Sequence, residues 1–562
     1  MMTDLQSNKK TKKKDDFLMQ GAILAVAMFL TKIIGVVYRI PLTNILGDEG
    51  NGFYGYAFEV YAMALMLSTF SLPVAVSKLV SARLAMHQKR NAFRVFLGAL
   101  AFSIVVGLVI SLLIFFGAGA ISTHMMESPL SVYALRVLAV GLFIVAVLGV
   151  LRGYFQGLGT MVPTAISQII EQIINAIVSI AGAKVLFDVG AAAGKKSGEE
   201  LLGPAYGAAG GTLGTVVGAF AALLFLLFAI FLYRNNIRRQ LKSDTTRRKE
   251  SYKRIIKILL ITIAPIIFST AIYNINQILD LTIFNKVMAA QGFTEKEYMA
   301  LQGIYTGKYN TLINVPLAMA NGLAASIIPS MTTAVAVHDK NQIHEKISQS
   351  IRFTMIIAIP CFIGFIVLGS PLMVLLYNDT SKTPATLLAV GSITVVLYCW
   401  STVSNSILQG LDKLSKPAKN AGISLVIHLI ALFIMLVVLK WNIYALVGSN
   451  IVFAICMCLL NARAIHKACD YRQEIDNTFV KPLIAALIMG AVTYLVHFIF
   501  DLLIGGRFTA TFIAILFAVI VYALALLKLG TLSNDDIRAL PQGDKILHIC
   551  KKFHLLPKYR ML

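Results

Sequence analysis

Long apolar segments alternate with short polar segments along almost the whole chain. Four stretches, residues 95–122, 201–233, 353–378 and 383–411, contain no Asp, Glu, Lys or Arg. A helix needs roughly 20 apolar residues to cross a bilayer, and a chain in lipid satisfies its backbone only as helices or a closed barrel. These segments are too long and too uniformly apolar for barrel strands, so they predict membrane-spanning helices.

The pattern predicts an all-α polytopic membrane protein with fourteen transmembrane helices. The expected spans are approximately residues 17–40, 53–77, 95–120, 130–151, 162–186, 206–233, 258–283, 303–330, 353–377, 385–408, 420–439, 443–462, 482–501 and 508–528. An even number of spans places both chain ends on the same side of the membrane.

Composition and charge agree with this pattern and predict the orientation. The 562 residues are 57% hydrophobic and 14% charged, whereas soluble proteins carry about 25% charged residues. Most Lys and Arg residues fall on the side that holds the N-terminus, and ten of them lie between Arg234 and Lys257. Basic loops stay in the cytoplasm, so both termini are predicted to be cytoplasmic and to face anionic lipid of the inner leaflet.

The same features argue against several other classes of protein. The net charge of +23 sits in short loops and tails and forms no basic domain, so nucleic-acid binding is not expected. Residues 1–16 are polar and basic, but the apolar segment after them is too long for a cleavable signal peptide. The six cysteines form no CxxC pair, and no P-loop, HExxH or GxSxG motif occurs. We therefore expect a cell-membrane protein with no enzymatic activity, cofactor or metal site.

An internal repeat is visible in the loops that follow the fourth and tenth spans. The first loop begins with Gln156-Gly157-Leu158 and continues to Pro163, and the second begins with Gln409-Gly410-Leu411 and continues to Pro417. The two copies are six spans apart, and six is even, so both copies have the same orientation. The sequence therefore predicts parallel repeats related by an axis along the membrane normal.

These observations divide the chain into bundles and connecting segments. The predicted parts are a cytoplasmic basic tail (1–16), a first six-helix bundle (17–233), a basic linker (234–257), a second six-helix bundle (258–466), helices thirteen and fourteen (479–529) and a cytoplasmic amphipathic tail (530–562).

Ionisable residues inside spans are costly in lipid and are therefore candidates for function. They are Lys32, Arg39, Glu59, Arg136, Glu171, Asp280 and Lys308. Lys32 and Arg39 are seven residues apart, so they share one helix face about 10 Å apart along the axis. The shallower charges have a structural alternative, which is snorkelling to the interface or a local ion pair. A cleft lined with Lys and Arg would attract an anion such as a phosphate or pyrophosphate.

Uncharged polar residues accompany these charges at helical spacing. Gln168, Gln172 and Asn175 form a stripe with Glu171 on the fifth span, which is otherwise built of apolar residues. The stripe either lines a watery cavity or bonds neighbouring helices together. A second, less charged lining is expected across the repeat, from Asn274, Asp280, Asn310 and Asn314.

The chain resembles a known transporter superfamily in several motifs. These are the two QGL loops with their prolines, the segment 167–172 in the fifth span, and the segment 315–329 in the eighth. They are similar to the polysaccharide-export branch of the multidrug/oligosaccharidyl-lipid/polysaccharide flippase superfamily, of the stage V sporulation protein B type and related to lipid II flippases. The resemblance implies two bundles in a V shape, alternating access, and a central cavity for the head group of a lipid-linked sugar.

The resemblance also implies roles for the charged residues. Lys32 and Arg39 occupy the helix whose cations grip the substrate pyrophosphate in lipid II flippases. Arg136 and Lys308 would assist them, and Glu59 and Glu171 would pair with the cations when no substrate is bound. Relatives often carry a basic residue where this chain has Asn175. The expected substrate is a polyprenyl-pyrophosphate-linked saccharide such as lipid II, moved from the inner to the outer leaflet.

Two other functions remain open at this point. A cation-coupled multidrug exporter of the same fold would use Glu171 and Asp280 to bind Na⁺ or H⁺ and a cationic drug. A scaffold for wall or spore-coat enzymes would tolerate the loss of all charges inside the membrane. The sign of the cavity separates the two transporters, and the sequence favours a basic one. The motive force is either the membrane potential or a coupled ion.

Overall fold

The described part of the chain is built of helices alone. The computed structural model describes residues 2–68, 72–244, 249–336, 339–413, 415–504, 507–531 and 548, and no strand occurs among them. This confirms the predicted all-α class. The predicted amphipathic tail, 530–562, lies almost wholly outside the described residues.

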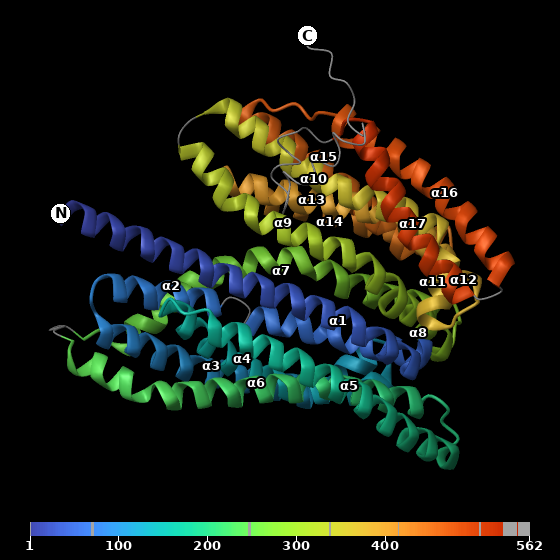
Figure 1. Ribbon diagram of the computed structural model, residues 1–562. Coiled ribbons are helices and arrows are strands. Elements are labelled where there is room, and N and C mark those ends of the chain that lie inside the picture. Colours follow the sequence, from blue (N-terminus) through green and yellow to red (C-terminus); the bar gives the residue numbers. More distant parts are fainter. Residues whose placement is uncertain are drawn as a thin grey trace, which may run out of the picture. The chain divides into compact units, whose positions relative to one another are not determined.

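Seventeen α-helices occur in this part, with five short π- or 3₁₀-helical turns beside them (Figure 1). The helices are α1 (Met2–Ser68), α2 (Leu72–Ala85), α3 (Lys89–Ala120), α4 (Val132–Gly157), α5 (Val162–Ser197), α6 (Leu202–Lys242), α7 (Tyr252–Ala290), α8 (Glu295–Gly303), α9 (Asn310–Ala336), α10 (Lys340–Val367), α11 (Gly369–Tyr377), α12 (Lys382–Gly391), α13 (Ile393–Gly410), α14 (Ser415–Phe433), α15 (Tyr444–Cys469), α16 (Lys481–Ile504) and α17 (Arg507–Lys528). The turns are η1 (Ile121–Met125), η2 (Pro129–Ser131), η3 (Ile304–Tyr309), η4 (Ile434–Val438) and η5 (Asp476–Val480).

The helices form two compact units. Unit 1 comprises residues 1–307 and contains α1 to α8, and unit 2 comprises residues 308–562 and contains α9 to α17. The sequence places the division earlier, at the basic linker 234–257. In the structure α7 packs against α1, α2 and α3, so this helix belongs to unit 1. The boundaries of the repeat itself remain a prediction.

Many of these helices are long and apolar enough to cross a membrane. Among the described residues nine segments qualify, or ten if α12 and α13, which meet at 40°, form one broken span. They coincide with the predicted spans three to six and nine to fourteen. The other four predicted spans lie on α1 with α2, on α7, and on η3 with α9. The protein is therefore a multi-pass membrane protein, and the total of fourteen spans remains a prediction.

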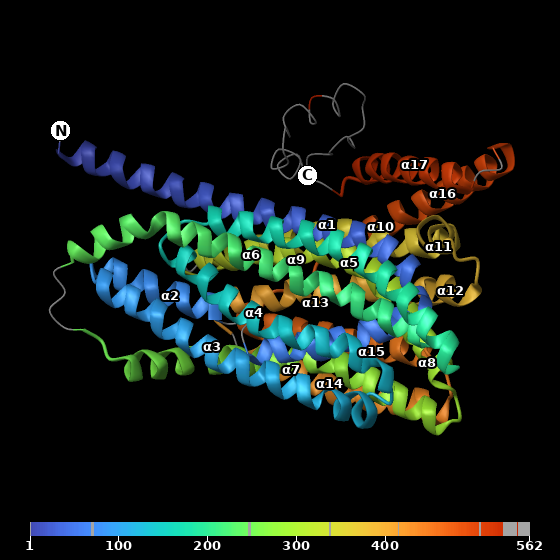
Figure 2. The same cartoon turned by 90° about the horizontal axis from the view of Figure 1, so that it is seen from below.

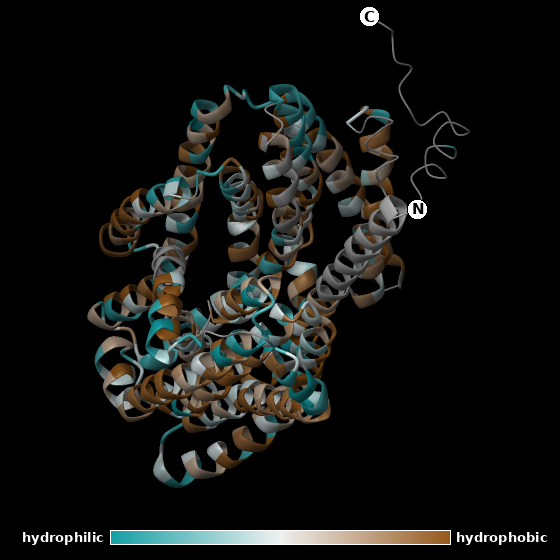
Figure 3. Ribbon diagram, turned by 90° about the vertical axis from the view of Figure 1, so that its left-hand side faces the viewer, coloured by the Kyte–Doolittle hydropathy of each residue, from teal (hydrophilic) through white to brown (hydrophobic). Residues whose placement is uncertain are grey.

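Large apolar side chains cover the outside of the helices. Leu502 and Phe116 are each 77% exposed, and Leu503 is 73% exposed. Figure 3 shows brown, hydrophobic residues along the helices and teal, hydrophilic residues at many helix ends and connections. A soluble protein rarely exposes large apolar side chains in contiguous patches. The apolar exterior is expected for helices that face lipid.

A sharp break at Gly47 divides α1 into the first two predicted spans. Gly47 has φ 67° and ψ −178°, a backbone conformation that side chains strongly disfavour. The Asn51 side chain donates from Nδ2 to the carbonyl oxygens of Thr43 (3.0 Å) and Gly47 (2.6 Å), and so bonds carbonyl groups that the break leaves free. The second predicted span, 53–77, is itself divided, because α1 ends at Ser68 and α2 begins at Leu72.

Helices α5 and α6 pack together through glycines on both partners. A Cβ atom added at Gly214 would collide with Ser179, and one added at Gly218 would lie 2.5 Å from the carbonyl oxygen of Glu171. Figures 1 and 2 show the two helices side by side along much of their length. Small residues let helix backbones approach closely in a membrane. This contact holds α5, the helix that carries the polar stripe, against α6.

Most of the predicted basic linker is helical. Helix α6 continues to Lys242 and α7 begins at Tyr252, so residues 243–251 alone connect them. Lys and Arg are good helix formers, and a helix needs apolar residues only within the bilayer. The connection is held against the α2–α3 hairpin, because Arg83 pairs with Glu250 (3.1 Å) and Arg94 Nε donates to the Glu250 carbonyl oxygen (2.8 Å).

The two QGL loops have the same backbone geometry. After the first, Gly159 has φ 84° and its N–H donates to the carbonyl oxygen of Gln156; after the second, Asp412 has φ 60° and its N–H donates to that of Gln409. The glycine of each motif also packs closely on a neighbouring helix of its own unit. Gly157 contacts Val80 of α2, and Gly410 contacts Met331 of α9. The loops are thus equivalent turns in units 1 and 2.

Candidate functional site

The charged residues of unit 1 begin with a cluster around Arg39. Its guanidinium lies over the ring of Tyr54, 5.1 Å from the ring centroid. The two residues would lie about 22 Å apart along a straight helix, so the break at Gly47 is what brings them together. Glu59 interacts electrostatically with both Arg39 and Asp280 of α7. One cation and two carboxylates from three helical segments therefore share one place.

The polar stripe of α5 lies directly beside this cluster. Asn175 is 7% exposed and donates from Nδ2 to the hydroxyl of Tyr38 (3.3 Å) on α1. A methyl group added at Gly35 would lie 3.2 Å from Nε2 of Gln172. The stripe therefore faces the side of α1 that carries Gly35, Tyr38 and Arg39. The structure thus brings these two helix faces together in unit 1.

A residue that the sequence did not single out, Arg152 of α4, is the direct partner of Glu171. Arg152 Nη2 lies 2.6 Å from Glu171 Oε2, and the two side chains are 15% and 25% exposed. Arg152 Nε also donates to the hydroxyl of Ser167 (3.0 Å). The ring of Tyr61, on the second segment of α1, interacts electrostatically with Glu171. The cation that pairs with Glu171 is thus Arg152 of α4, which was not among the cations expected to pair with it.

The sequence does contain a signal for Arg152. It lies four residues before Gln156, and Ser167 and Glu171 follow the same loop on α5. With the span ending near residue 151, Arg152 fell in the loop, where a basic residue has no special meaning. Helix α4 in fact continues to Gly157, so Arg152 lies within the helix. An Arg about one helical turn before the end of a helix, followed by an acid on the helix after the loop, is the pattern that predicts this ion pair.

For three predicted site residues, Lys32, Arg136 and Gln168, the described contacts include no bond to the Arg39 cluster. Lys32 is exposed on α1, one helical turn before Gly35. Arg136 is exposed on α4, and its guanidinium lies over the ring of Phe115 on α3, 5.9 Å from the centroid. Among the described contacts, the guanidinium of Arg136 therefore meets Phe115 and not a residue of the Arg39 cluster. Gln168 has a buried Oε1 for which the described residues provide no donor.

In unit 2 the predicted cation Lys308 forms a buried ion pair. Its Nζ lies 2.6 Å from Asp379 Oδ2, and the side chains are 8% and 14% exposed. Burial alone would raise the pKa of Asp379, but its hydrogen bonds with Lys308 and Ser381 hold that pKa below its ordinary value. Of the predicted second lining, Asn310 is half-buried and Asn314 is exposed. The side chain of Asn274, which belongs to unit 1, lies outside the described residues.

Unit 2 also holds a network of neutral amides. Asn420 Nδ2 donates to Asn461 Oδ1, and Asn461 Nδ2 donates to Asn405 Oδ1, each at 2.8 Å. The three residues come from α14, α15 and α13, and all are buried. Asn405 stands four residues before Gln409, as Arg152 stands four before Gln156. Equivalent positions of the two QGL turns thus carry an amide in one unit and a guanidinium in the other.

Two family profiles each match more than half of this chain. The family described as polysaccharide biosynthesis protein matches residues 17–335, and the family described as lipid II flippase MurJ matches residues 200–514. The chain belongs to both families. The resemblance drawn from the QGL loops and the fifth span is thereby confirmed.

Relatives in Bacillus subtilis (strain 168) align over nearly the full length of the chain. The lipid II flippase MurJ is 24% identical over 546 residues, which cover 93% of this chain and 97% of the relative. The stage V sporulation protein B is 24% identical over 535 residues, which cover 94% and 98%. The chain is similar to each of these proteins from end to end.

Solved structures share the fold. A lipid II flippase MurJ in an inward closed conformation matches with a TM-score of 0.62 at 15% identity, covering 90% of this chain and 98% of that one. An inward-facing multidrug resistance transporter of the MATE family, from the MOP superfamily, matches with a TM-score of 0.63 at 17% identity, covering 79% and 98%. At such identities the likeness establishes the fold alone.

Proposed function

We propose that this protein is a flippase that moves a polyprenyl-pyrophosphate-linked saccharide, such as lipid II, from the inner to the outer leaflet. Membership of the lipid II flippase family supports the reaction. The observation that carries the proposal is the polar cluster of unit 1. There Arg152 pairs with Glu171 of the neighbouring helix α5, Arg39 lies over Tyr54 within electrostatic range of Glu59, and Lys32 is exposed on the same helix as Arg39.

The cluster has the chemistry to exchange an internal acid for a substrate anion. Guanidinium groups bind phosphate oxygens with two parallel hydrogen bonds, which makes them strong pyrophosphate ligands. Without substrate, Glu171 and Glu59 balance the charge of Arg152 and Arg39. A pyrophosphate displaces these acids from the guanidinium groups, and its departure lets the pairs re-form. Lys32, exposed on the same helix as Arg39, adds a further cation, and Lys308 is the cation that unit 2 offers to the substrate.

The transport cycle we propose is alternating access by two six-helix repeats. The equivalent QGL turns of units 1 and 2 support parallel repeats, each presenting the same elements to the same side of the membrane. The basic loops support cytoplasmic termini and contact with anionic lipid of the inner leaflet. The apolar segments support fourteen spans. The membrane potential or a coupled Na⁺ or H⁺ would supply the energy.

The test is rescue of a strain whose growth or sporulation depends on this protein. We expect Arg39→Gln and Arg152→Gln to abolish rescue, and Lys32→Ala to weaken it. Flipping of a labelled lipid-linked saccharide in proteoliposomes should fall by at least about tenfold, since a hydrogen bond to a charged group contributes about 1.5–3 kcal/mol. Arg136→Gln is the matched control, because that guanidinium lies against Phe115, and it should behave as wild type.

Loss of rescue counts only if the variant folds. Thermal unfolding of each purified variant in detergent, together with its level in the membrane, separates poor folding from lost transport. Arg152→Lys keeps the charge but not the two-pronged geometry, and we expect partial activity from it. Full rescue by both Lys32→Ala and Arg39→Ala would contradict the proposed pyrophosphate grip.

A cation-coupled multidrug exporter is the second candidate, favoured by one observation. Around Arg39 the carboxylates of Glu59 and Asp280 outnumber the single cation, and such a group suits Na⁺, H⁺ or a cationic drug. Similarity to the MATE transporter agrees with this fold. Deletion that raises drug susceptibility while wall synthesis stays unchanged would favour the exporter. A flippase predicts the reverse, with accumulation of the lipid-linked precursor in the inner leaflet.

A further inference from the structure

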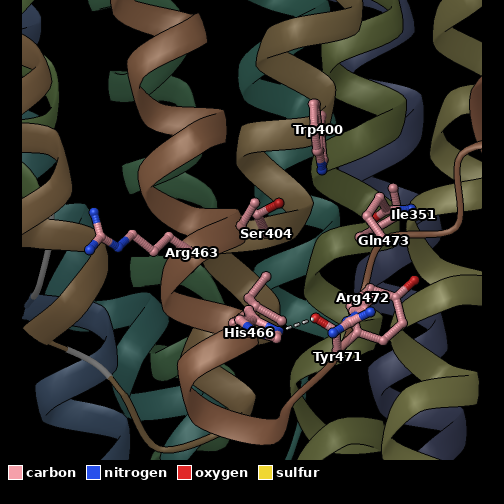
Figure 4. A pocket seen from close by; sticks show the side chains of 10 residues that line it. Ile351, Trp400, Ser404, Arg463, His466, Tyr471, Arg472 and Gln473 are labelled. Carbon is pink, nitrogen blue, oxygen red and sulfur yellow. Dashed lines mark hydrogen bonds between the residues drawn. The ribbon is translucent and has the colours of Figure 1, made fainter.

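A cavity of about 340 Å³ lies inside unit 2, apart from the residues assigned to transport. It is enclosed by α10, α13, α15 and the segment that connects α15 to η5. Figure 4 shows its side chains, which are Ile351, Trp400, Ser404, Ala462, Arg463, Ile465, His466, Tyr471, Arg472 and Gln473. Ligand pockets usually measure roughly 300–1,000 Å³, so this cavity suits a small group.

A buried hydroxyl in the wall of this cavity has no partner within the described residues. Ser404 is fully buried, and its Oγ forms no hydrogen bond there. Leaving such a group unsatisfied costs about 1–3 kcal/mol, so buried hydroxyls are normally bonded. Trp400 lines the same space from one helical turn earlier on α13. The unbonded hydroxyl indicates that a polar ligand or water completes this wall.

Basic side chains border the cavity. Arg463, His466 and Arg472 all line it and are exposed. His466 Nδ1 donates to the Tyr471 carbonyl oxygen (3.1 Å), which fixes the ring and leaves Nε2 available. In Figure 4 Arg463 and Arg472 lie on opposite sides of α15. The acid Glu474 follows Gln473 in the chain, accepts a hydrogen bond from Ser348 (3.0 Å) and is not among the lining residues. Because the described lining includes two guanidinium groups and no carboxylate, the border favours an anion.

We propose that this cavity binds the phosphodiester head group of an anionic phospholipid of the inner leaflet. Its residues lie near the cytoplasmic ends of the predicted spans nine, ten and twelve, or follow span twelve, where the chain is on the basic, cytoplasmic side. Basic pockets between helices on that side bind anionic lipid head groups, and Trp sits at the lipid–water interface. Arg472 and His466 meet the phosphate, and Ser404 donates its free hydroxyl. The cavity is too small for a saccharide–peptide head group, so this site differs from the transport site.

The experiment measures lipid binding to the full chain in detergent, by thermal unfolding and native mass spectrometry. We expect phosphatidylglycerol to raise the unfolding temperature and to stay bound, and phosphatidylcholine and inorganic phosphate to do neither. Arg472→Gln should weaken phosphatidylglycerol binding about tenfold, the loss of one charge-assisted hydrogen bond. Lys467→Gln is the matched control, because Lys467 is exposed at the end of α15 but does not line the cavity.

Ser404→Ala provides a second, independent readout. Because the hydroxyl is unbonded without ligand, its removal should leave the lipid-free protein equally or more stable while weakening lipid binding. Equal stabilisation by phosphatidylcholine would overturn the proposal. So would equal effects of Arg472→Gln and Lys467→Gln. Stabilisation by inorganic phosphate as strong as that by phosphatidylglycerol would assign the cavity to a soluble anion and would also overturn the lipid proposal.

Discussion

Units 1 and 2 contain the same turn but different chemistry beside it. In unit 1, Arg152 stands four residues before the glutamine of the QGL motif and pairs with Glu171 at 2.6 Å. In unit 2, Asn405 stands at the equivalent place and joins Asn461 and Asn420 in a chain of amides. Both polar groups tie the helix before the turn to neighbouring helices.

The difference separates what the fold requires from what a charged substrate requires. Both turns need a left-handed residue and a close glycine, and both have them, at Gly159 with Gly157 and at Asp412 with Gly410. A neutral amide network is enough to bond helices in a membrane. Charges are far costlier there, so an ion pair beside the turn of unit 1, at the position where unit 2 has an amide, is best explained by a role that an amide cannot fill.

The largest effect on folding is expected when Asn405 of unit 2 is replaced by arginine, the residue that unit 1 has at the equivalent position. Asn405→Arg would bury a charge among amides that have no acid to neutralise it, at a cost of several kcal/mol. We expect little folded protein in the membrane, measured by gel filtration of the solubilised chain. Asn341→Arg, at an exposed position on α10, is the control and should express normally. Normal folding of Asn405→Arg would mean that the amide network also accommodates a charge.

The next effect is expected at the buried pair of unit 2. Asp379→Asn leaves Lys308 buried without its acid, and breaking a buried pair costs about 3–5 kcal/mol. The unfolding temperature in detergent should fall clearly, and the double variant Lys308→Met with Asp379→Leu should regain most of it. Equal stability of Asp379→Asn and wild type would show that the ion pair does not stabilise the fold.

The same pair gives a pH dependence with a definite sign. Because the pKa of Asp379 is held below its ordinary value, the pair stabilises the protein above the ordinary carboxyl pKa. This stabilisation is lost as the pH falls through the lowered pKa. Acid unfolding followed by circular dichroism should therefore be less steep for Asp379→Asn than for wild type.

Replacing Arg152 of unit 1 by asparagine is expected to lower stability less but to reduce transport strongly. Arg152→Asn gives unit 1 the residue of unit 2 and leaves the partly exposed Glu171 unpaired, at a cost of about 2 kcal/mol. Arg152→Asn combined with Glu171→Gln should recover stability in a double-mutant cycle but not transport. Recovery of both would make the pair structural and weaken the comparison.

The smallest effect is expected in the amide network itself. Asn461→Ala removes the central amide, and each lost hydrogen bond contributes about 1 kcal/mol. The unfolding temperature should fall slightly, and flipping by the folded protein should stay near wild type. A loss of flipping as large as that of Arg152→Asn would place substrate contacts in unit 2 as well.

Some of the site could be predicted from the sequence because it depends on local periodicity. The stripe of Gln172 and Asn175 and the shared face of Gly35 and Arg39 follow from helical spacing, and the two helices do meet there. Arg136 was expected at the site because it is a charge inside a span. Its direction is set by the neighbours of α4, and the structure turns it toward Phe115.

The sequence alone determined that the chain is helical and crosses a membrane. The length of an apolar segment and its helical period are local properties, and they decide whether a segment is stable in lipid. It also revealed the repeated turn, since glycine permits the tight backbone that a turn needs and proline fixes φ, wherever they stand. Only the tertiary structure decided which charges meet. Arg152 with Glu171, and Lys308 with Asp379, are pairs between helices, and such pairs depend on helix rotation and on breaks such as Gly47. Spacing along one helix cannot specify these, because the partner lies on another.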